Sequence, residues 1–488
     1  MPIDQTTSRL AWETLLDLGE GPGTLVVRLE RSLRDAVRSG RAPVGAALPA
    51  SRRLAEALGV SRWVVTEVYG QLVAEGVLEA RAGSTTRVAP GGVVPGRAER
   101  GAAPEHDGAA TPSPARAPAP RPVLNLAPGV PDLRHAPRDA WLRAAREALA
   151  LATRDDLAAR PSAGHPRARA VVAGHLRRAR LAATDEDAVV LTHGATHGMT
   201  LAAAALAARG HTRLLVEEPS WPVLREVARR AGLEPVGVPV GPGGVDVDAL
   251  EAASRRTGAR AVLLTPAHQF PTGEALAPER RHQVLAWARS VDGLVVEDDY
   301  DAEFRYDRRP VAALQGADPD RVLLLGSLTK TIAPAFALGW ATVPAAWRDA
   351  VAAAAGLGTG PSVIDQLTFA RLVESGGYDR HLRAQRARYR RRRDAVVAAL
   401  ARELPGARVG GIAAGMHLLV ELPGSPPPDA ADVVREAAAR GVAVTDLRRY
   451  RAADGPCSTL VLGYGDVAEA RVDSAVGLLA QAVRAAQP

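Results

Sequence analysis

The sequence predicts a multidomain protein with a small, mainly helical N-terminal domain and a large α/β domain that ends in a smaller α/β subdomain. Three observations support this. At 488 residues the chain is longer than one ordinary core. A segment rich in Pro, Ala and Gly, residues 91–122, divides it. Beyond this linker, short apolar runs alternate with Ala-rich helical stretches, which is typical of a mostly parallel sheet covered on both faces.

The composition limits the classes of protein to consider. Hydrophobic residues make up 47% and charged residues 24%, which are values of a globular protein. The single cysteine, Cys457, excludes an internal disulfide framework and a Cys-rich metal site. No apolar run reaches the roughly 18 residues of a membrane-spanning helix, and the first residues lack a secretory pattern. We therefore expect a cytoplasmic protein with no membrane partner.

Residues 1–23 are expected to form an N-terminal extension, and residues 24–90 a compact winged helix-turn-helix domain. Apolar residues four apart predict a first helix that ends near Gly40. A second helix is predicted over 51–58, with Gly59 in the turn. Ser61 is placed to cap a third helix that stops before Gly76. Two short strands, 77–80 and 85–89, would form the wing.

A helix-turn-helix with a local basic excess indicates binding to double-stranded DNA. Residues 24–90 hold ten arginines and six acidic residues. The third helix would enter the major groove, while flanking side chains and the wing hold phosphates. The candidate DNA contacts are Ser51, Arg52, Arg53, Ser61, Arg62, Trp63, Thr66 and, in the wing, Gly83.

Lys330 is unusual, because the other 60 of the 61 basic residues are arginines. A guanidinium stays charged and cannot replace an amine that must lose its proton and attack a carbonyl. Lys330 is therefore a candidate for a Schiff base with a carbonyl cofactor. The alternative is a surface lysine left over in an Arg-rich chain.

Residues that follow the predicted strands match the needs of pyridoxal 5'-phosphate (PLP), which are an amine, an acid for the ring nitrogen, a donor for the phenolic oxygen and a phosphate cradle. Lys330 supplies the amine. Asp298 is placed to pair with the ring nitrogen, with Asp299 as the close competitor, and Tyr300 to donate to the phenolate. Trp221 is placed to stack on the ring. The candidate phosphate cradle is Gly194, Ala195, Thr196, Ser327 and Thr329.

Two family resemblances follow from these motifs. The stretch PASRRLAEALGVSRWVVTEVYGQLVAEGVLEARAGSTTRV resembles the GntR family of regulators, and residues from about 123 to 488 resemble a class I aminotransferase domain of PLP-dependent fold type I, with its small subdomain from about 375. The phrases TPAHQFPTG and VVEDDYDAEFRYDRRPVAALQG resemble the MocR subfamily, in which both domains occur in this order. The resemblance implies a homodimeric transcriptional regulator that binds operator DNA and PLP, with PLP or an amino compound as effector.

The sequence departs from the aminotransferase pattern at the phosphate. An arginine is usual seven or eight residues after the lysine, where this chain has Ala337 and Leu338. Losing such a contact costs about 1.5–3 kcal/mol, or roughly a ten- to hundredfold loss of affinity. Phe270 stands where true aminotransferases have Asn, a change that the MocR subfamily shares. Both departures favour a regulator, with a working aminotransferase or a cofactor-free regulator as the alternatives.

Three further features have simpler interpretations. Arg448 and Arg449 are candidates to bind a ligand carboxylate, although either would equally face solvent. The run from Arg388 to Arg393 is expected on the solvated face of a long helix. The histidines show no spacing typical of metal ligands, so the sequence predicts no metal.

Overall fold

The computed structural model describes residues 11–16, 18, 24–80, 85–89, 124–158, 161–306, 311–356 and 360–487. The chain divides into two compact units, residues 1–116 and 117–488. The predicted wing residue Gly83 and the predicted linker lie outside the described residues.

The first unit is a small helical domain with a two-stranded sheet. Its helices are α1 (Trp12–Leu15), α2 (Leu25–Arg38), α3 (Ser51–Leu58) and α4 (Arg62–Ala74), and its strands are β1 (Leu78–Glu79) and β2 (Arg87–Val88). The strands pair antiparallel, with Leu78 opposite Val88. The apolar faces of the helices meet in one core, centred on fully buried Leu33, Val65 and Leu72. The predicted helices and strands of residues 24–90 are confirmed.

Local signals explain where the two helices of the helix-turn-helix end and begin. Gly59 terminates α3 with φ of 65°, a left-handed conformation that glycine adopts without strain. Ser61 caps α4, since its side chain accepts a hydrogen bond from the backbone N–H of Val64 at 3.4 Å. Gly59 therefore sets where α3 ends, and Ser61 sets where α4 begins.

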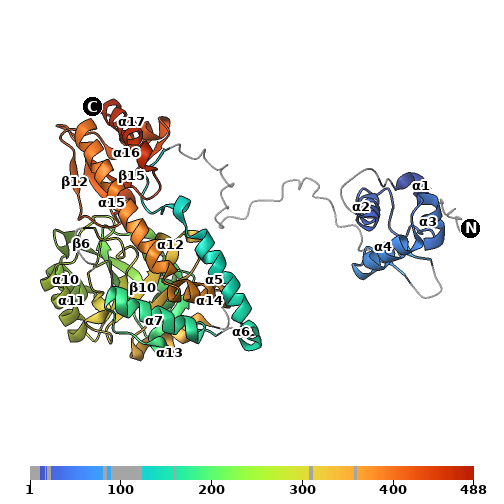
Figure 1. Cartoon of the computed structure of the whole chain (residues 1–488), viewed down its shortest axis with the longest axis horizontal. Helices are drawn as coiled ribbons and strands as arrows, with labels where there is room; N and C mark the ends of the chain where they lie inside the picture. Colours follow the sequence, from blue (N-terminus) through green and yellow to red (C-terminus); the bar gives the residue numbers. More distant parts are fainter. Residues whose placement is uncertain are drawn as a thin grey trace, which may run out of the picture. The chain divides into compact units, whose positions relative to one another are not determined.

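The second unit is built on an eight-stranded sheet of order β4-β11-β10-β9-β8-β5-β6-β7. Figure 1 shows helices around this sheet, of which β6 and β10 are labelled. Its strands are β4 (Val189–Thr192), β5 (Arg213–Glu218), β6 (Glu234–Gly241), β7 (Gly244–Val245), β8 (Ala261–Leu264), β9 (Leu294–Asp298), β10 (Val322–Ser327) and β11 (Gly339–Thr342). The neighbours from β10 to β6 run parallel, whereas β11 is antiparallel to β10 and β4. The carboxyl ends of β4, β5, β8, β9 and β10 therefore lie at one edge.

Helices cover both faces of this sheet because consecutive strand residues point to opposite sides. Val296 packs with α8 (Ala195–Ala208), α9 (Pro222–Arg230) and α13 (Arg348–Ala355), whereas its neighbour Val295 packs with α10 (Val247–Thr257) and α11 (Pro278–Ser290). A further layer holds α5 (Arg138–Leu151), α6 (Arg154–Ala158), α7 (Pro166–Arg180) and α14 (Val363–Glu374). The predicted α/β fold is confirmed.

The smaller C-terminal subdomain has its own antiparallel sheet, of order β12-β13-β16-β15. Its strands are β12 (Arg408–Gly410), β13 (His417–Glu421), β15 (Thr445–Asp446) and β16 (Thr459–Gly463), and its helices are α15 (Gly377–Glu403), α16 (Ala430–Ala439) and α17 (Val472–Ala485). One strand pairing was not predicted from the sequence. β3 (Leu124–Asn125) pairs in parallel with β14 (Val442–Ala443), so the first described residues of the unit attach to its last part.

The Arg-rich run in α15 is only partly solvated. Arg392 is 3% exposed, donates to Gly465 O at 2.6 Å and forms an ion pair with buried Asp132. Tyr389 is fully buried. The expectation of a solvated run was therefore wrong for Arg392, because α15 turns this side of the helix toward the interior.

Within the part of the chain that the structure describes, no helix combines the length and the apolar character that crossing a membrane requires.

Candidate functional site

A cavity of about 240 Å³ lies at the carboxyl ends of the parallel strands. In open α/β sheets this edge is where ligands bind. Residues at or just after the carboxyl ends of β4, β5, β8, β9 and β10 line the cavity, together with Met416 and His417 of the small subdomain. The walls include Gly194, Ala195, Thr196, Trp221, Asp298, Tyr300, Ser327, Thr329 and Lys330. All of the predicted cofactor-binding residues therefore meet in one place.

Lys330 lies in the short helix α12 (Leu328–Thr331), directly after β10. Its Nζ donates to the carbonyl oxygen of Gly129 at 2.5 Å. Burial lowers the pKa of Lys330 below its ordinary value, and the carboxylates of Asp301 and Asp298 only partly oppose this shift. A buried amine that loses its proton more readily is better suited to attack a carbonyl. The structure therefore disfavours the alternative of a surface lysine.

The structure separates Asp298 from its competitor Asp299. Asp299 forms a two-point ion pair with the buried Arg180, with distances of 2.7 Å to Nε and 2.8 Å to Nη2. Asp298 instead lines the cavity, and its buried Oδ1 has no partner among the described residues. Burial, with Asp299 and Asp301 nearby, raises the pKa of Asp298 to about 7. A protonated ring nitrogen would satisfy this oxygen, so Asp298 fits the role and Asp299 does not.

The candidate phosphate cradle is formed by two strand ends and one helix N-terminus. Gly194 precedes α8 with φ of 104°, and a Cβ at this position would lie 3.3 Å from Ser327 Oγ. Ser327 Oγ donates to Thr329 Oγ1 at 2.7 Å. Backbone N–H groups at the start of a helix favour an anion. This hydroxyl-lined cradle, in which a side chain at residue 194 would be strained and tightly packed, fits a phosphate group.

Two aromatic residues complete the walls. Trp221 packs edge-on against Phe270, with ring centroids 5.7 Å apart, and stacks with Tyr450 at 6.1 Å. Tyr300 Oη lies 3.1 Å from Nδ1 of His268. Burial raises the pKa of Tyr300 well above its ordinary value, and Asp301 adds to the shift. Its hydroxyl therefore keeps its proton and is able to donate.

Ala337 and Leu338, where an arginine is usual in aminotransferases, lie outside the cavity lining. Leu338 is buried and Ala337 is exposed, with φ of 42°. Neither residue lines the cavity, and the only side-chain cation in its described lining is Lys330. The phosphate cradle therefore consists of hydroxyl and backbone groups.

The structure does not bring the two candidate carboxylate-binding arginines to the cavity. Arg448 forms ion pairs with Asp446 and Asp429, the first at 2.7 Å. Arg449 is exposed, and neither arginine is part of the described lining. Their assignment as ligand contacts remains a prediction that no contact in this structure supports.

The sequence analysis did not assign Glu217, Asp301 or His417 to the site, although all three line the cavity, nor His268, which contacts Tyr300 of the lining. Glu217 accepts hydrogen bonds from the backbone N–H and the hydroxyl of Thr265, at 3.0 and 2.5 Å. Burial raises its pKa to about 7. The available signal was position, because Glu217 and Asp301 adjoin the ends of predicted strands. His417 carried no such signal, because it begins a strand of the other sheet.

The described DNA-binding candidates lie on the helix-turn-helix. Arg62, Trp63 and Thr66 share the exposed side of α4, opposite the buried valines, and Trp63 is 66% exposed. Arg52 and Arg53 are exposed at the start of α3, where Ser51 is partly exposed. Ser61 is occupied as the cap of α4. The exposed face of α4 therefore presents a cation, an aromatic ring and a hydroxyl.

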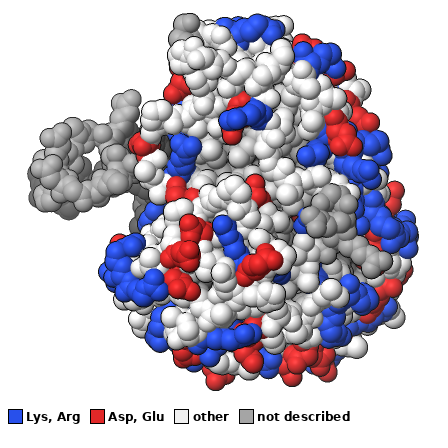
Figure 2. Space-filling model, turned by 90° about the vertical axis from the view of Figure 1, so that its left-hand side faces the viewer, with Lys and Arg blue, Asp and Glu red and all other residues white. Residues whose placement is uncertain are grey.

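The face of the second unit in Figure 2 does not resemble a nucleic-acid surface. Arginine and acidic side chains are interspersed over it, and neither sign forms an extended patch. Polyanion binding calls for a field of one sign. This face gives no reason to place DNA on the large unit.

Comparisons with known proteins assign both units. Residues 25–88 match the model for bacterial regulatory proteins of the gntR family, and residues 121–459 match that for aminotransferases of class I and II. Among solved structures, an archaeal alanine:glyoxylate aminotransferase is similar over 74% of this chain and 91% of its own, with 23% identity and a TM-score of 0.68. The α-aminoadipate aminotransferase LysN of Thermus thermophilus covers 74% of this chain and 92% of its own, with 26% identity and a TM-score of 0.66.

Two curated relatives contain both units. The chain is 33% identical to the pyridoxine biosynthesis transcriptional regulator PdxR of Corynebacterium glutamicum, over 91% of this chain and 92% of that protein. It is 30% identical to the probable rhizopine catabolism regulatory protein MocR of Rhizobium meliloti, over 90% of each. The chain thus belongs to the MocR-type transcriptional regulators of the GntR family, which join a helix-turn-helix domain to an aminotransferase-like domain.

Proposed function

We propose that this regulator binds PLP covalently through Lys330 and that the bound cofactor, alone or with an amino compound, controls its binding to operator DNA. One observation carries the proposal: the half-buried amine of Lys330 and the carboxylate oxygen of Asp298 that has no described partner line the same cavity. The active form would be a homodimer that acts in the cytoplasm.

Each residue of the cavity would have a separate task. Lys330 would attach the cofactor through Nζ, and Asp298 would hold the proton of the ring nitrogen. The hydroxyl of Tyr300 would donate to the phenolic oxygen. Gly194, Ser327 and Thr329 would bind the phosphate, with N–H groups of Ala195 and Thr196. PLP supplies an aldehyde that condenses reversibly with primary amines, and this chemistry would make the site selective for amino compounds.

Because Lys330 is the only lysine, covalent attachment is open to a sharp test. The full-length protein is incubated with PLP, reduced with borohydride and digested, and the mass of each peptide is measured. We expect one modified peptide, which contains Lys330. Lys330→Arg is the matched control, because it keeps the positive charge and removes the nucleophile. Equal labelling of wild type and Lys330→Arg would refute the assignment.

The alternatives give different results in the same preparation. Steady-state transfer of an amino group from any donor would show a working aminotransferase. No labelling of a folded wild-type protein would show a regulator without PLP, in which the altered phosphate cradle has abolished binding.

The DNA half of the proposal places α4 in the major groove. The motif docks in this way, and the exposed Arg62, Trp63 and Thr66 support it. Fragments selected by the wild-type protein from random DNA provide the operator. Its affinity is then measured with and without PLP, and an unchanged affinity would contradict cofactor control.

A further inference from the structure

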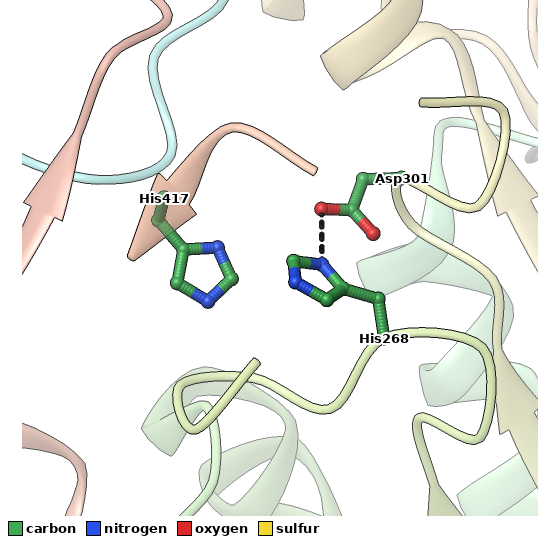
Figure 3. Close-up of side chains that lie close together, drawn as sticks. All are labelled: His268, Asp301 and His417. Atoms are coloured by element: carbon green, nitrogen blue, oxygen red, sulfur yellow. Dashed lines mark hydrogen bonds and ion pairs between the residues drawn. The ribbon is translucent and has the colours of Figure 1, made fainter. Parts of the chain in front are cut away.

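His268, Asp301 and His417 form a buried cluster at the wall of the cavity. They come from the loop after β8, the loop after β9 and the first residue of β13. Each is at most 4% exposed, and one potential ligand atom from each lies within 4.8 Å of the others. Figure 3 shows the two imidazole rings side by side, with the carboxylate of Asp301 above His268.

Hydrogen bonding leaves one nitrogen of His268 free. Nδ1 lies 2.9 Å from Asp301 Oδ2, and a carboxylate only accepts, so Nδ1 carries the proton. The lone pair is then on Nε2, which is buried and has no partner among the described residues. In Figure 3 this side of the ring faces His417. Histidines that bind metals commonly donate their other N–H to a carboxylate in this way.

Two further lone pairs belong to the same cluster. His417 Nε2 lies 3.2 Å from the carbonyl oxygen of Pro271, which only accepts, so Nε2 carries the proton and Nδ1 the lone pair. Asp301 Oδ1 is buried and has no described partner. Leaving a buried acceptor unsatisfied costs about 1–3 kcal/mol. A cation between the two rings would satisfy Nε2 of His268 and Nδ1 of His417 together.

We propose that His268 Nε2 and His417 Nδ1 bind a divalent transition-metal ion such as Zn²⁺, with Asp301 as the supporting carboxylate that accepts the N–H of His268 Nδ1. Imidazole ligands suit such an ion better than Mg²⁺ or Ca²⁺. Water or another ligand from solution would complete the coordination of the ion. The surroundings favour a cation, because Glu217, Asp298 and Asp301 face the cavity with Lys330 as the only described lining cation.

The backbone of the small subdomain packs directly on this cluster. Gly415 has φ of 67°, and a Cβ there would collide with the ring of His268 and with Asp301 Oδ2. His417, two residues on, is the proposed ligand that the small subdomain supplies, whereas His268 belongs to the large sheet's edge. A bound ion would therefore connect the small subdomain to the edge of the large sheet.

Metal binding is measured on full-length, chelator-treated protein without PLP, so the result is independent of the Lys330 test. Co²⁺ is titrated and its ligand-field absorbance recorded, and Zn²⁺ is titrated by calorimetry. We expect one ion per chain. His268→Ala and His417→Ala should each weaken affinity on the order of tenfold or more, as loss of the supporting carboxylate does in metal sites. His282→Ala is the control, because His282 is exposed on α11.

Circular dichroism confirms that each variant is folded. If an alanine variant is not, the near-isosteric Asp301→Asn gives the same comparison. Absence of saturable binding by the wild type would overturn the proposal. So would an affinity that is unchanged in the folded His268, His417 or Asp301 variants. Loss of binding in His197→Ala instead would assign the ion to the pair His193 and His197, whose rings lie 5.4 Å apart.

Discussion

Replacement of Asp298 by Asn should stabilise the cofactor-free protein, although it should weaken PLP binding. Asp298 is 8% exposed, and burial raises its pKa from 3.8 to about 7. One pKa unit corresponds to about 1.4 kcal/mol, so ionised Asp298 costs the folded state about 4 kcal/mol above pH 7. Asparagine has no charge to bury. Part of this gain is offset because its amide donors also require partners.

The change of this stability gain with pH can be predicted more closely than the gain itself. The folded state binds the proton of Asp298 more tightly than the unfolded state, so stability is lost as the pH rises from about 4 through 7. The advantage of Asp298→Asn should therefore grow by about 2 kcal/mol between pH 5.5 and pH 8. The offset from the amide does not depend on pH and cancels in this difference.

The assay is urea denaturation of full-length, cofactor-free protein at both pH values, following the transition of the large unit. Asp299→Asn is the matched control, because it makes the same change one residue away. Asp299 is the partner of Arg180, which is 1% exposed, and breaking such a buried pair costs about 3–5 kcal/mol. The two neighbouring substitutions should therefore change the free energy of unfolding in opposite directions, with Asp298→Asn raising it and Asp299→Asn lowering it. An advantage of Asp298→Asn that is equal at both pH values would refute the reasoning.

Three other substitutions test the DNA surface and the phosphate cradle. Arg62→Ala should weaken DNA binding and lower the slope of log affinity against log salt by about one, measured by fluorescence anisotropy; an unchanged slope would remove Arg62 from the phosphate contacts. Gly194→Ala should reduce PLP affinity, because its Cβ would lie 3.3 Å from Ser327 Oγ and its φ of 104° strains any L side chain. Labelling of the variant at wild-type PLP concentrations would contradict this. Ala337→Arg should raise PLP affinity about tenfold in equilibrium titration, by providing a bidentate phosphate contact; no gain would place residue 337 out of reach of the phosphate.

Local patterns were sufficient for much of the fold. The second helix of the helix-turn-helix was predicted over 51–58 and is found there. Its end depends on Gly59 and the start of the next helix on Ser61, and both residues act through hydrogen bonds within a few positions. The buried strands were predicted from apolar runs for the same reason, since burial on both faces removes alternation.

Lys330 could also be proposed from the sequence as the Schiff-base lysine, because arginine cannot supply that chemistry. The choice between Asp298 and Asp299 could not be made from the sequence. Both follow the same strand, and consecutive residues point to opposite sides. Only the assembled sheet shows that one side faces the cavity and the other faces Arg180.

The sequence by itself determined the two units, their order, the helices of the helix-turn-helix and the position of the candidate lysine, since each rests on periodicity, capping or residue chemistry within a short segment. Tertiary structure alone decided the inward side of α15 at Arg392 and the meeting of His268, Asp301 and His417. The physical reason is the same in both cases. Those contacts join segments far apart in the chain, and the packing of helices and sheets, which no local pattern encodes, brings them together.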